Sequence, residues 1–208
     1  MSDEATERIH SATPARRQLA RQQGYAAKSH DLAFAAVFLA VRKTALSGRI
    51  IAAILAFFWL WVALMFWLPS VLQGFMPGII FVVVFLIQGG LWVWQAVKPK
   101  LTFGFTQDIS SWAGVLFILY ALVGYPLVGA LLGHTYPRMS PFGLTPCPVV
   151  TFTFGLLLLA KLKIPKMLLI LPLFYAFSGF VWISIGMWED LGMILSGILG
   201  AGLICYRD

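Results

Sequence analysis

The sequence predicts an all-α integral membrane protein: a bundle of six spanning helices, preceded by a basic helix that lies on the membrane surface. Three observations lead to this fold class. Hydrophobic residues make up 60% of the 208 residues and charged residues only 11%, whereas charged residues are about a quarter of a soluble domain. Long apolar runs follow one another with short connections between them. The lysines and arginines collect in every second connection.

The spanning helices are predicted from the length of the apolar runs. A helix needs about 20 apolar residues to cross roughly 30 Å of hydrocarbon. Four runs without a charged residue reach this length, at residues 50–68, 79–97, 112–132 and 167–185. The run 191–206 is shorter and rich in glycine. We expect it to span as well, because small residues allow membrane helices to pack closely.

Two further runs are too short to be assigned by length alone. We expect residues 146–160 to form the sixth span, because Lys161 and Lys163 can bury their methylene stems and raise their ammonium groups to the interface. The run 32–41 has only ten residues between Asp31 and Arg42, a length typical of an interfacial or re-entrant segment. A seventh span follows only if this segment also crosses.

The distribution of basic residues predicts the orientation in the membrane. Alternate connections, together with Arg207, hold nine lysines and arginines on one side, and the connections of the other side hold only Arg138. Lys and Arg are retained on the cytoplasmic side, so we expect a bacterial inner-membrane protein with both termini cytoplasmic. The tail also carries five basic residues and has no signal-peptide pattern. We attribute the net charge of +7 to this orientation rather than to nucleic-acid binding.

The first part of the chain resembles a known family of export proteins. The stretch "ATPARRQLARQQGYAAKSHDL", residues 12–32, is similar to the amino terminus of the flagellar and type III secretion export-switch (FlhB) family, and the likeness extends to about residue 40. The matching positions are Thr13, Pro14, Arg16, Ala20, Arg21, Gly24, Lys28, Ser29, Asp31 and Leu32. The self-cleavage motif Asn-Pro-Thr-His of that family does not occur in this sequence. The resemblance implies a role in protein export.

From about residue 47 onwards the chain resembles a different family, an uncharacterised bacterial group of multi-span membrane proteins. The segments that carry this resemblance are "SGRIIAAILAFFWLW", "FGFTQDISSWAG", "YPLVGALLGHTYP", "FGLTPCPVVTFTFGLLLLA" and "WEDLGMILSG". The resemblance implies a membrane location and no assigned activity. We therefore expect two parts, a basic cytoplasmic or interfacial segment at residues 1–46 and a polytopic membrane domain at residues 47–208.

The predicted topology places the connections 133–148 and 186–190 on the same, extracytoplasmic face. The chemically active side chains that converge there are His134, Tyr136, Arg138, Cys147, Glu189 and Asp190. Imidazole and thiolate suit copper, zinc or iron, which makes His134 and Cys147 weak candidate ligands. We nevertheless expect no metal and no cofactor, because these residues lack the spacing of a local metal site. The alternatives are a rigid proline-rich turn with a structural role, a small-molecule pocket between helix ends, and a nucleophile–base pair of Cys147 and His134.

The basic tail gives a second candidate site. Arg16, Arg17, Arg21 and Lys28 near a membrane surface would attract anionic lipid, by about 1 kcal/mol each, or would form a solvated helix that only fixes orientation. The function that we expect is a non-enzymatic binding or scaffold role in the membrane. The alternatives are a component of protein export and a small-solute or metal-binding transporter. The expected partners are the bilayer, a second copy or other membrane proteins, and no nucleic acid.

Overall fold

The computed structural model describes residues 14–41, 45–134 and 142–207, and within these ranges it consists of helices without a strand. Two isolated β-bridges, Phe103 to Ala160 and Phe142 to Thr145, are the extended pairings recorded there. Five helices are long and apolar enough to cross a membrane: Leu46–Leu72, Gly78–Val97, Ile109–Leu131, Lys166–Ser184 and Trp188–Arg207. The all-α class is thus confirmed, and the molecule is consistent with a membrane protein.

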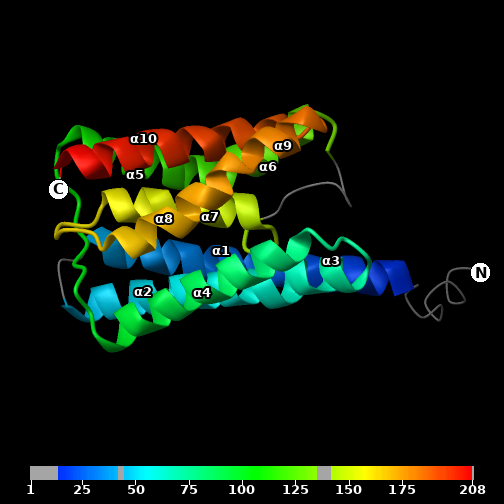
Figure 1. Cartoon of the computed structure of the whole chain (residues 1–208), viewed down its shortest axis with the longest axis horizontal. Helices are drawn as coiled ribbons and strands as arrows, with labels where there is room; N and C mark the ends of the chain where they lie inside the picture. The colour runs from blue at the N-terminus through cyan, green and yellow to red at the C-terminus, as the bar shows by residue number, and fades with distance from the viewer. Residues whose placement is uncertain (1–13, 42–44, 135–141, 208) are drawn as a thin grey trace, which may run out of the picture.

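Three antiparallel helix pairs make up most of the bundle (Figure 1). The first pairs α2 (Ala45–Val62), which continues through η2 (Ala63–Trp67) and α3 (Leu68–Leu72), with α4 (Gly78–Val97). The second pairs α5 (Ile109–Leu119), η3 (Tyr120–Gly124) and α6 (Tyr125–Leu131) with α7 (Pro146–Leu158). The third pairs α8 (Lys166–Phe177) and α9 (Gly179–Ser184) with η4 (Trp188–Asp190) and α10 (Leu191–Arg207).

This pairing sorts the connections onto two ends of the bundle. One end carries the connections 98–108 and 159–165 and the carboxyl terminus (Figure 1). It holds the lysines at positions 98, 100, 161 and 163, and we call it the basic end. The opposite end carries the turns after α3, α6 and α9. Each of these three turns contains a glycine with positive φ: Gly74, Gly133 and Gly186. Residues other than glycine rarely adopt this conformation.

The first helix of every pair is irregular where it approaches the end opposite the basic end. The π-helical turn η2 is followed by Pro69, and η3 is followed by Pro126. In the third pair Pro172 lies inside α8, and α9 begins at Gly179. Proline has no N–H to donate to the preceding turn, and π-turns occur mostly as single insertions at functional sites. The two π-turns and the break at Gly179 therefore lie towards the same end of the bundle, whereas Pro172 lies nearer the basic end.

The expected sixth span is a short helix enclosed by its neighbours. Helix α7 has 13 residues, all of them buried, and lies in the middle of the bundle (Figure 1). Thirteen residues rise about 20 Å, which falls short of the roughly 30 Å of hydrocarbon. At its carboxyl end Arg207 donates from Nη1 to the Leu158 carbonyl at 3.1 Å. The expectation of a sixth span depended on Lys161 and Lys163 extending this short run, but α7 ends at Leu158, before both lysines, and the sixth span is not confirmed.

Helix α1 (Pro14–Val41) lies along the bundle and packs against α2 (Figure 1). Ala33, Ala36 and Ala40 recur at helical spacing and are completely buried. The segment 32–41 had been expected at the membrane surface, and in the structure it runs beside a helix that is long enough to span. Alanine side chains permit this close approach. The described start of α1 lies at the end of the bundle opposite to the carboxyl terminus.

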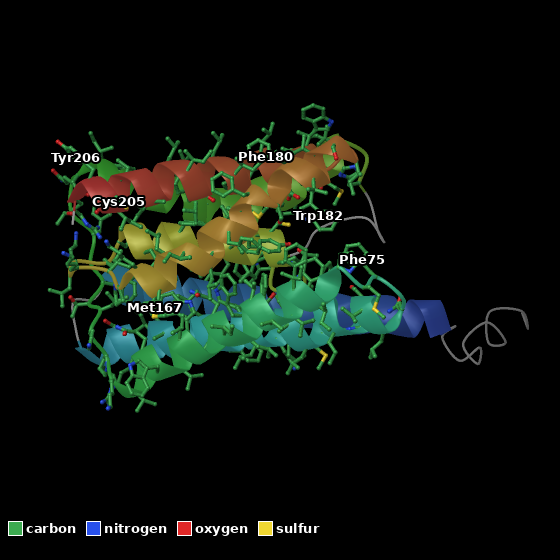
Figure 2. All side chains as sticks on the ribbon, in the orientation of Figure 1. Phe75, Met167, Phe180, Trp182, Cys205 and Tyr206 are labelled. Carbon is green, nitrogen blue, oxygen red and sulfur yellow. The ribbon has the colours of Figure 1, made fainter. Side chains whose placement is uncertain are left out.

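The outer surface is as apolar as a lipid environment requires. Large hydrophobic side chains such as Phe34, Ile80, Leu116 and Phe180 are more than half exposed. Met167, Phe180 and Tyr206, which Figure 2 labels, are likewise exposed. Contiguous exposed apolar surface of this kind marks contact with a membrane or with another protein.

Asp108 fixes the start of α5 at the basic end. Its Oδ1 accepts the Ser111 backbone N–H at 2.7 Å, and its Oδ2 accepts the Thr106 hydroxyl at 2.6 Å. This is the pattern of an N-cap, which satisfies a backbone donor that the helix itself cannot. The Thr106 hydrogen bond, ahead of those from Ser111, lowers the pKa of Asp108 from its usual 3.8 to about 2.

We expect Asp108 to make the stability of the protein depend on acid. Because its pKa is lower in the folded state, its contribution is complete above the unfolded value of 3.8 and is lost as the pH falls towards about 2. Asp108→Asn, which keeps the cap, should flatten the decline of the free energy of unfolding between pH 5 and pH 2, measured by circular dichroism in detergent. The exposed Asp31→Asn is the control. An unchanged acid dependence in Asp108→Asn would contradict this role.

Candidate functional site

Four of the six residues expected at the extracytoplasmic face come together at the end of the bundle opposite the basic end. His134 follows α6, Glu189 and Asp190 form η4, and Cys147 lies in the first turn of α7. Tyr136 and Arg138 lie outside the described residues. Two tyrosines complete the group, which we call the acidic cluster: Tyr125, His134, Cys147, Tyr175, Glu189 and Asp190.

Glu189 contacts the histidine. Its side chain is completely buried, and its Oε1 and Oε2 lie 3.0 and 3.2 Å from His134 Nδ1. The imidazole is within hydrogen-bonding distance of the carboxylate and is itself 16% exposed. The backbone carbonyl of Glu189 accepts the Tyr120 hydroxyl at 2.7 Å. His134 is therefore the point at which the cluster reaches the surface.

Asp190 contacts neutral donors. Its Oδ1 accepts the Tyr125 hydroxyl, and its Oδ2 lies 3.6 Å from Cys147 Sγ, which donates to it. Cys147 Sγ also lies 3.7 Å from the Tyr175 hydroxyl. Asp190 is 2% exposed and Tyr175 is fully buried. A chain of hydrogen-bonding groups thus runs from Tyr125 through Asp190 and Cys147 to Tyr175, in the interior.

The π-turn η3 directs two tyrosines towards η4: Tyr125 donates to the Asp190 side chain, and Tyr120 donates to the Glu189 backbone carbonyl. The Tyr125 N–H donates to the Tyr120 carbonyl, five residues back, so that this turn stacks residues five apart rather than four. The two rings lie 5.3 Å apart in an edge-to-face arrangement. Gly192 makes room for them, because a Cβ at that position would lie 1.9 Å from Tyr120 Cε1. A regular α-helix would turn one of these rings away from the cluster.

The start of α7 supplies the thiol from within the bundle. The first turn of a helix leaves backbone N–H groups without a partner, and a buried start must limit their number. Pro146 and Pro148 have no N–H, so that two of these donors do not exist. Pro146, Cys147 and Pro148 are all buried. The prolines around Cys147 therefore allow a helix to begin inside an apolar interior.

An aromatic layer packs beside the cluster. Trp67, the last residue of η2, lies 6.1 Å from the Tyr175 ring and 6.2 Å from the Trp182 ring. Phe75, which Figure 2 labels together with Trp182, packs on Trp67 at 6.4 Å. The indole N–H groups of Trp67 and Trp182 are buried and have no acceptor in the described part of the chain.

The acidic cluster places two carboxylate side chains in the apolar interior of the bundle, which is unusual. Two consecutive carboxylates are buried, and in the described ranges the ion pair recorded for them is the one to His134. Burying an ionised carboxylate without a charged partner costs several kcal/mol or more. Acidic residues inside a membrane bundle usually mark a functional pathway or binding site. The arrangement can hold and exchange protons, because each hydrogen-bond partner of the two side chains among the described residues is a protonatable group.

Other arrangements are less well supported by the geometry. Across the described residues, no three His, Cys, Asp or Glu side chains form a group that could hold a metal ion. Cys147 contacts Asp190 while His134 contacts Glu189, so the thiol and the imidazole do not form a nucleophile–base pair. The second thiol, Cys205, is exposed near the carboxyl terminus, far from the cluster (Figure 2).

The sequence interpretation missed the tyrosines and Trp67. They lie within long apolar runs, where an aromatic residue is usually core or interface. A signal was present in the repeated pattern of an apolar run that ends in an aromatic residue close before a proline, "FWLP" and "GYP". Of the expected lipid-binding residues, Lys28 is exposed. Arg16, Arg17 and Arg21 lie on α1, and their side chains are outside the described part.

Comparisons with known proteins place the chain in a family. Residues 31–208 match a family of unknown function, DUF6064. The match starts within α1 and includes every described residue of the acidic cluster. No curated protein and no solved structure matches the chain, and the expected likeness of residues 12–40 to the export-switch proteins receives no support from these findings. The chain therefore belongs to DUF6064, a family of unknown function, which agrees with its resemblance to an uncharacterised family.

Proposed function

We propose that this protein is a non-enzymatic binding protein of the bacterial inner membrane, and that its acidic cluster takes up protons from the extracytoplasmic side. The observation that carries the proposal is the burial of Glu189 and Asp190 against protonatable partners, with His134 partly exposed above them. We propose a proton as the ligand because the buried side chains fill the site and leave no room for a larger molecule. Tyr125, Tyr175, Glu189 and Asp190 are each at most 2% exposed.

The orientation rests on the distribution of charge. In the sequence, the alternate connections and Arg207 hold nine lysines and arginines, and the other connections hold Arg138. Seven of the nine are described residues at or beside the basic end: Arg49, Lys98, Lys100, Lys161, Lys163, Lys166 and Arg207. By the positive-inside rule the basic end faces the cytoplasm, so the acidic cluster faces outward. Under this orientation the carboxyl terminus is cytoplasmic. A cytoplasmic amino terminus would require α1 to leave its place beside α2, since the described start of α1 lies at the cluster end.

The polar groups favour binding from one side over transport through the bundle. Beyond Cys147, the next polar residues on α7 are Thr151 and Thr153. Both hydroxyls donate to carbonyls of their own helix, those of Cys147 and Val149, at 3.1 and 2.8 Å. Transport commonly uses ionisable residues along the path, and α7 offers none between the cluster and the basic end. We therefore place the transporter role behind the binding role.

Infrared difference spectroscopy of the detergent-solubilised protein tests the proposal. A pH step that loads the cluster should produce the C=O stretching band of a protonated carboxylic acid. We expect Glu189→Gln or Asp190→Asn to remove or shift this band, because each substitution removes one of the two buried carboxyl groups and keeps its size. Asp31→Asn, at an exposed position on α1, is the matched control. A band that is identical in the wild type and in both cluster variants would refute proton uptake at this site.

A further inference from the structure

A narrow crevice lies between α1 and α2, separate from the acidic cluster. Its volume is about 210 Å³, it is open to the outside, and almost all of its lining surface is apolar. The residues that line it are Lys28, Ser29, Leu32, Phe57, Trp61 and Gly143. Leu32 and Phe57 are 36% and 45% exposed, so the crevice opens on the perimeter of the bundle, where a membrane protein meets lipid.

Two residues that line the crevice, Ser29 and Gly143, join α1 to the segment before α7. The Ser29 hydroxyl donates to the Phe142 carbonyl at 2.7 Å, which ties α1 to the segment before α7. Gly143 has a φ of +77°, and a Cβ there would lie 2.4 Å from Ser29 Cβ. Both the positive φ and the short distance to Ser29 require glycine at position 143. The sequence therefore determines the shape of this part of the crevice. The crevice is therefore a formed feature of the fold.

The charge beside the crevice is positive. Lys28 is exposed and lines the crevice, while α1 as a whole carries four basic residues and one acidic residue, Asp31. By helical spacing, positions 17, 21 and 28 fall on the same face of α1. An exposed cation above an apolar slot matches the two parts of a phospholipid, the anionic phosphate and the acyl chain.

The depth of Lys28 also suits a lipid headgroup. Lys28 precedes Val41, the last residue of α1, by thirteen positions, or about 20 Å along the helix. Beside a helix that crosses roughly 30 Å of hydrocarbon, this places the Lys28 backbone in the half of the membrane nearer the cluster end. A lysine at such a depth extends its ammonium group to the interface, where the phosphates of that leaflet lie.

We propose that this crevice is a binding site for an anionic phospholipid of the leaflet at the cluster end. An acyl chain fills the slot between Leu32, Phe57 and Trp61, and the phosphate pairs with the Lys28 ammonium. The site is independent of the acidic cluster, because none of its lining residues belongs to that group.

Native mass spectrometry of the protein in mild detergent, titrated with phosphatidylglycerol and in parallel with phosphatidylethanolamine, tests this site. We expect one tightly held phosphatidylglycerol. Lys28→Gln should weaken it about fivefold, the equivalent of the roughly 1 kcal/mol that one basic residue contributes near anionic lipid. Leu32→Trp, which fills the slot, should release both lipids, and its thermal unfolding will show whether the fold is kept.

Two controls separate this site from general lipid attraction. Lys163 is an exposed lysine at the basic end, and Lys163→Gln should leave the tightly held lipid in place. Glu189→Gln should also leave it unchanged, so that failure of proton uptake and failure of lipid binding remain distinguishable. Equal loss of phosphatidylglycerol in Lys28→Gln and Lys163→Gln would overturn the proposal. Equal affinity for phosphatidylethanolamine in the wild type would overturn it as well.

Discussion

Gly155→Ala is expected to destabilise the protein strongly, because it separates α5 from α7. A Cβ at position 155 would lie 2.7 Å from Ile118 Cγ1, 2.8 Å from the Gly114 carbonyl oxygen and 3.1 Å from the Ile118 backbone nitrogen. Two of these three atoms belong to the backbone and cannot rotate away. Overpacking of this kind costs about 1–3 kcal/mol. The measurement is the thermal unfolding of the purified protein in detergent, followed by tryptophan fluorescence.

Glycines with open surroundings provide the control for this substitution. A Cβ at Gly90 in α4 or at Gly202 in α10 meets no atom within 4 Å. Alanine at either position should leave the unfolding temperature unchanged or raise it, since alanine has the higher helix propensity, by about 1 kcal/mol. If Gly155→Ala unfolds at the same temperature as Gly90→Ala, the close packing of α5 on α7 is not a source of stability.

Asp190→Ala is expected to produce the second large loss of stability. It removes the acceptor of the Tyr125 hydroxyl and of the Cys147 thiol, and both donors are buried. A buried donor left without a partner costs about 1–3 kcal/mol. Asp190→Asn keeps one acceptor oxygen and should be milder. The free energy of unfolding, obtained by denaturant titration in detergent, measures the difference between the two variants.

A double-mutant cycle isolates the contact between Asp190 and Tyr125. Tyr125→Phe removes the donor and keeps the ring, which also packs on Tyr120 at 5.3 Å. If the hydrogen bond contributes to stability, the losses in Asp190→Asn and Tyr125→Phe should sum to more than the loss in the double variant. Strict additivity would show that the two side chains stabilise the fold independently.

Much of the bundle follows from the distribution of apolar and basic residues. Four of the five long helices lie where charge-free runs of sufficient length occur, because the hydrocarbon thickness sets their length, and the fifth covers the shorter glycine-rich run 191–206. The placement of α1 could not be read in this way. Its segment 32–41 has too few apolar residues to span alone, and it is the small side chains of Ala33, Ala36 and Ala40 that fit it against α2.

Part of the candidate site could be predicted from the sequence. His134, Cys147, Glu189 and Asp190 stand out because polar residues are rare in so apolar a chain, and antiparallel helices bring their segments to one end. Tyr120 and Tyr125 did not stand out, because their role depends on the π-turn between them. That turn shifts the register by one residue, and hydrophobic periodicity alone does not reveal such a shift.

The enclosed position of α7 has a consequence for how the protein is made. A helix of 13 residues is too short to be held across a bilayer by its own length, and one of its main neighbours, α10, is synthesised after it. Before α10 has been made, the side of α7 that packs against α10 is not covered. The burial of α7 must therefore wait for the third helix pair, and a nascent chain stopped before residue 191 would lack the helix that covers one side of α7.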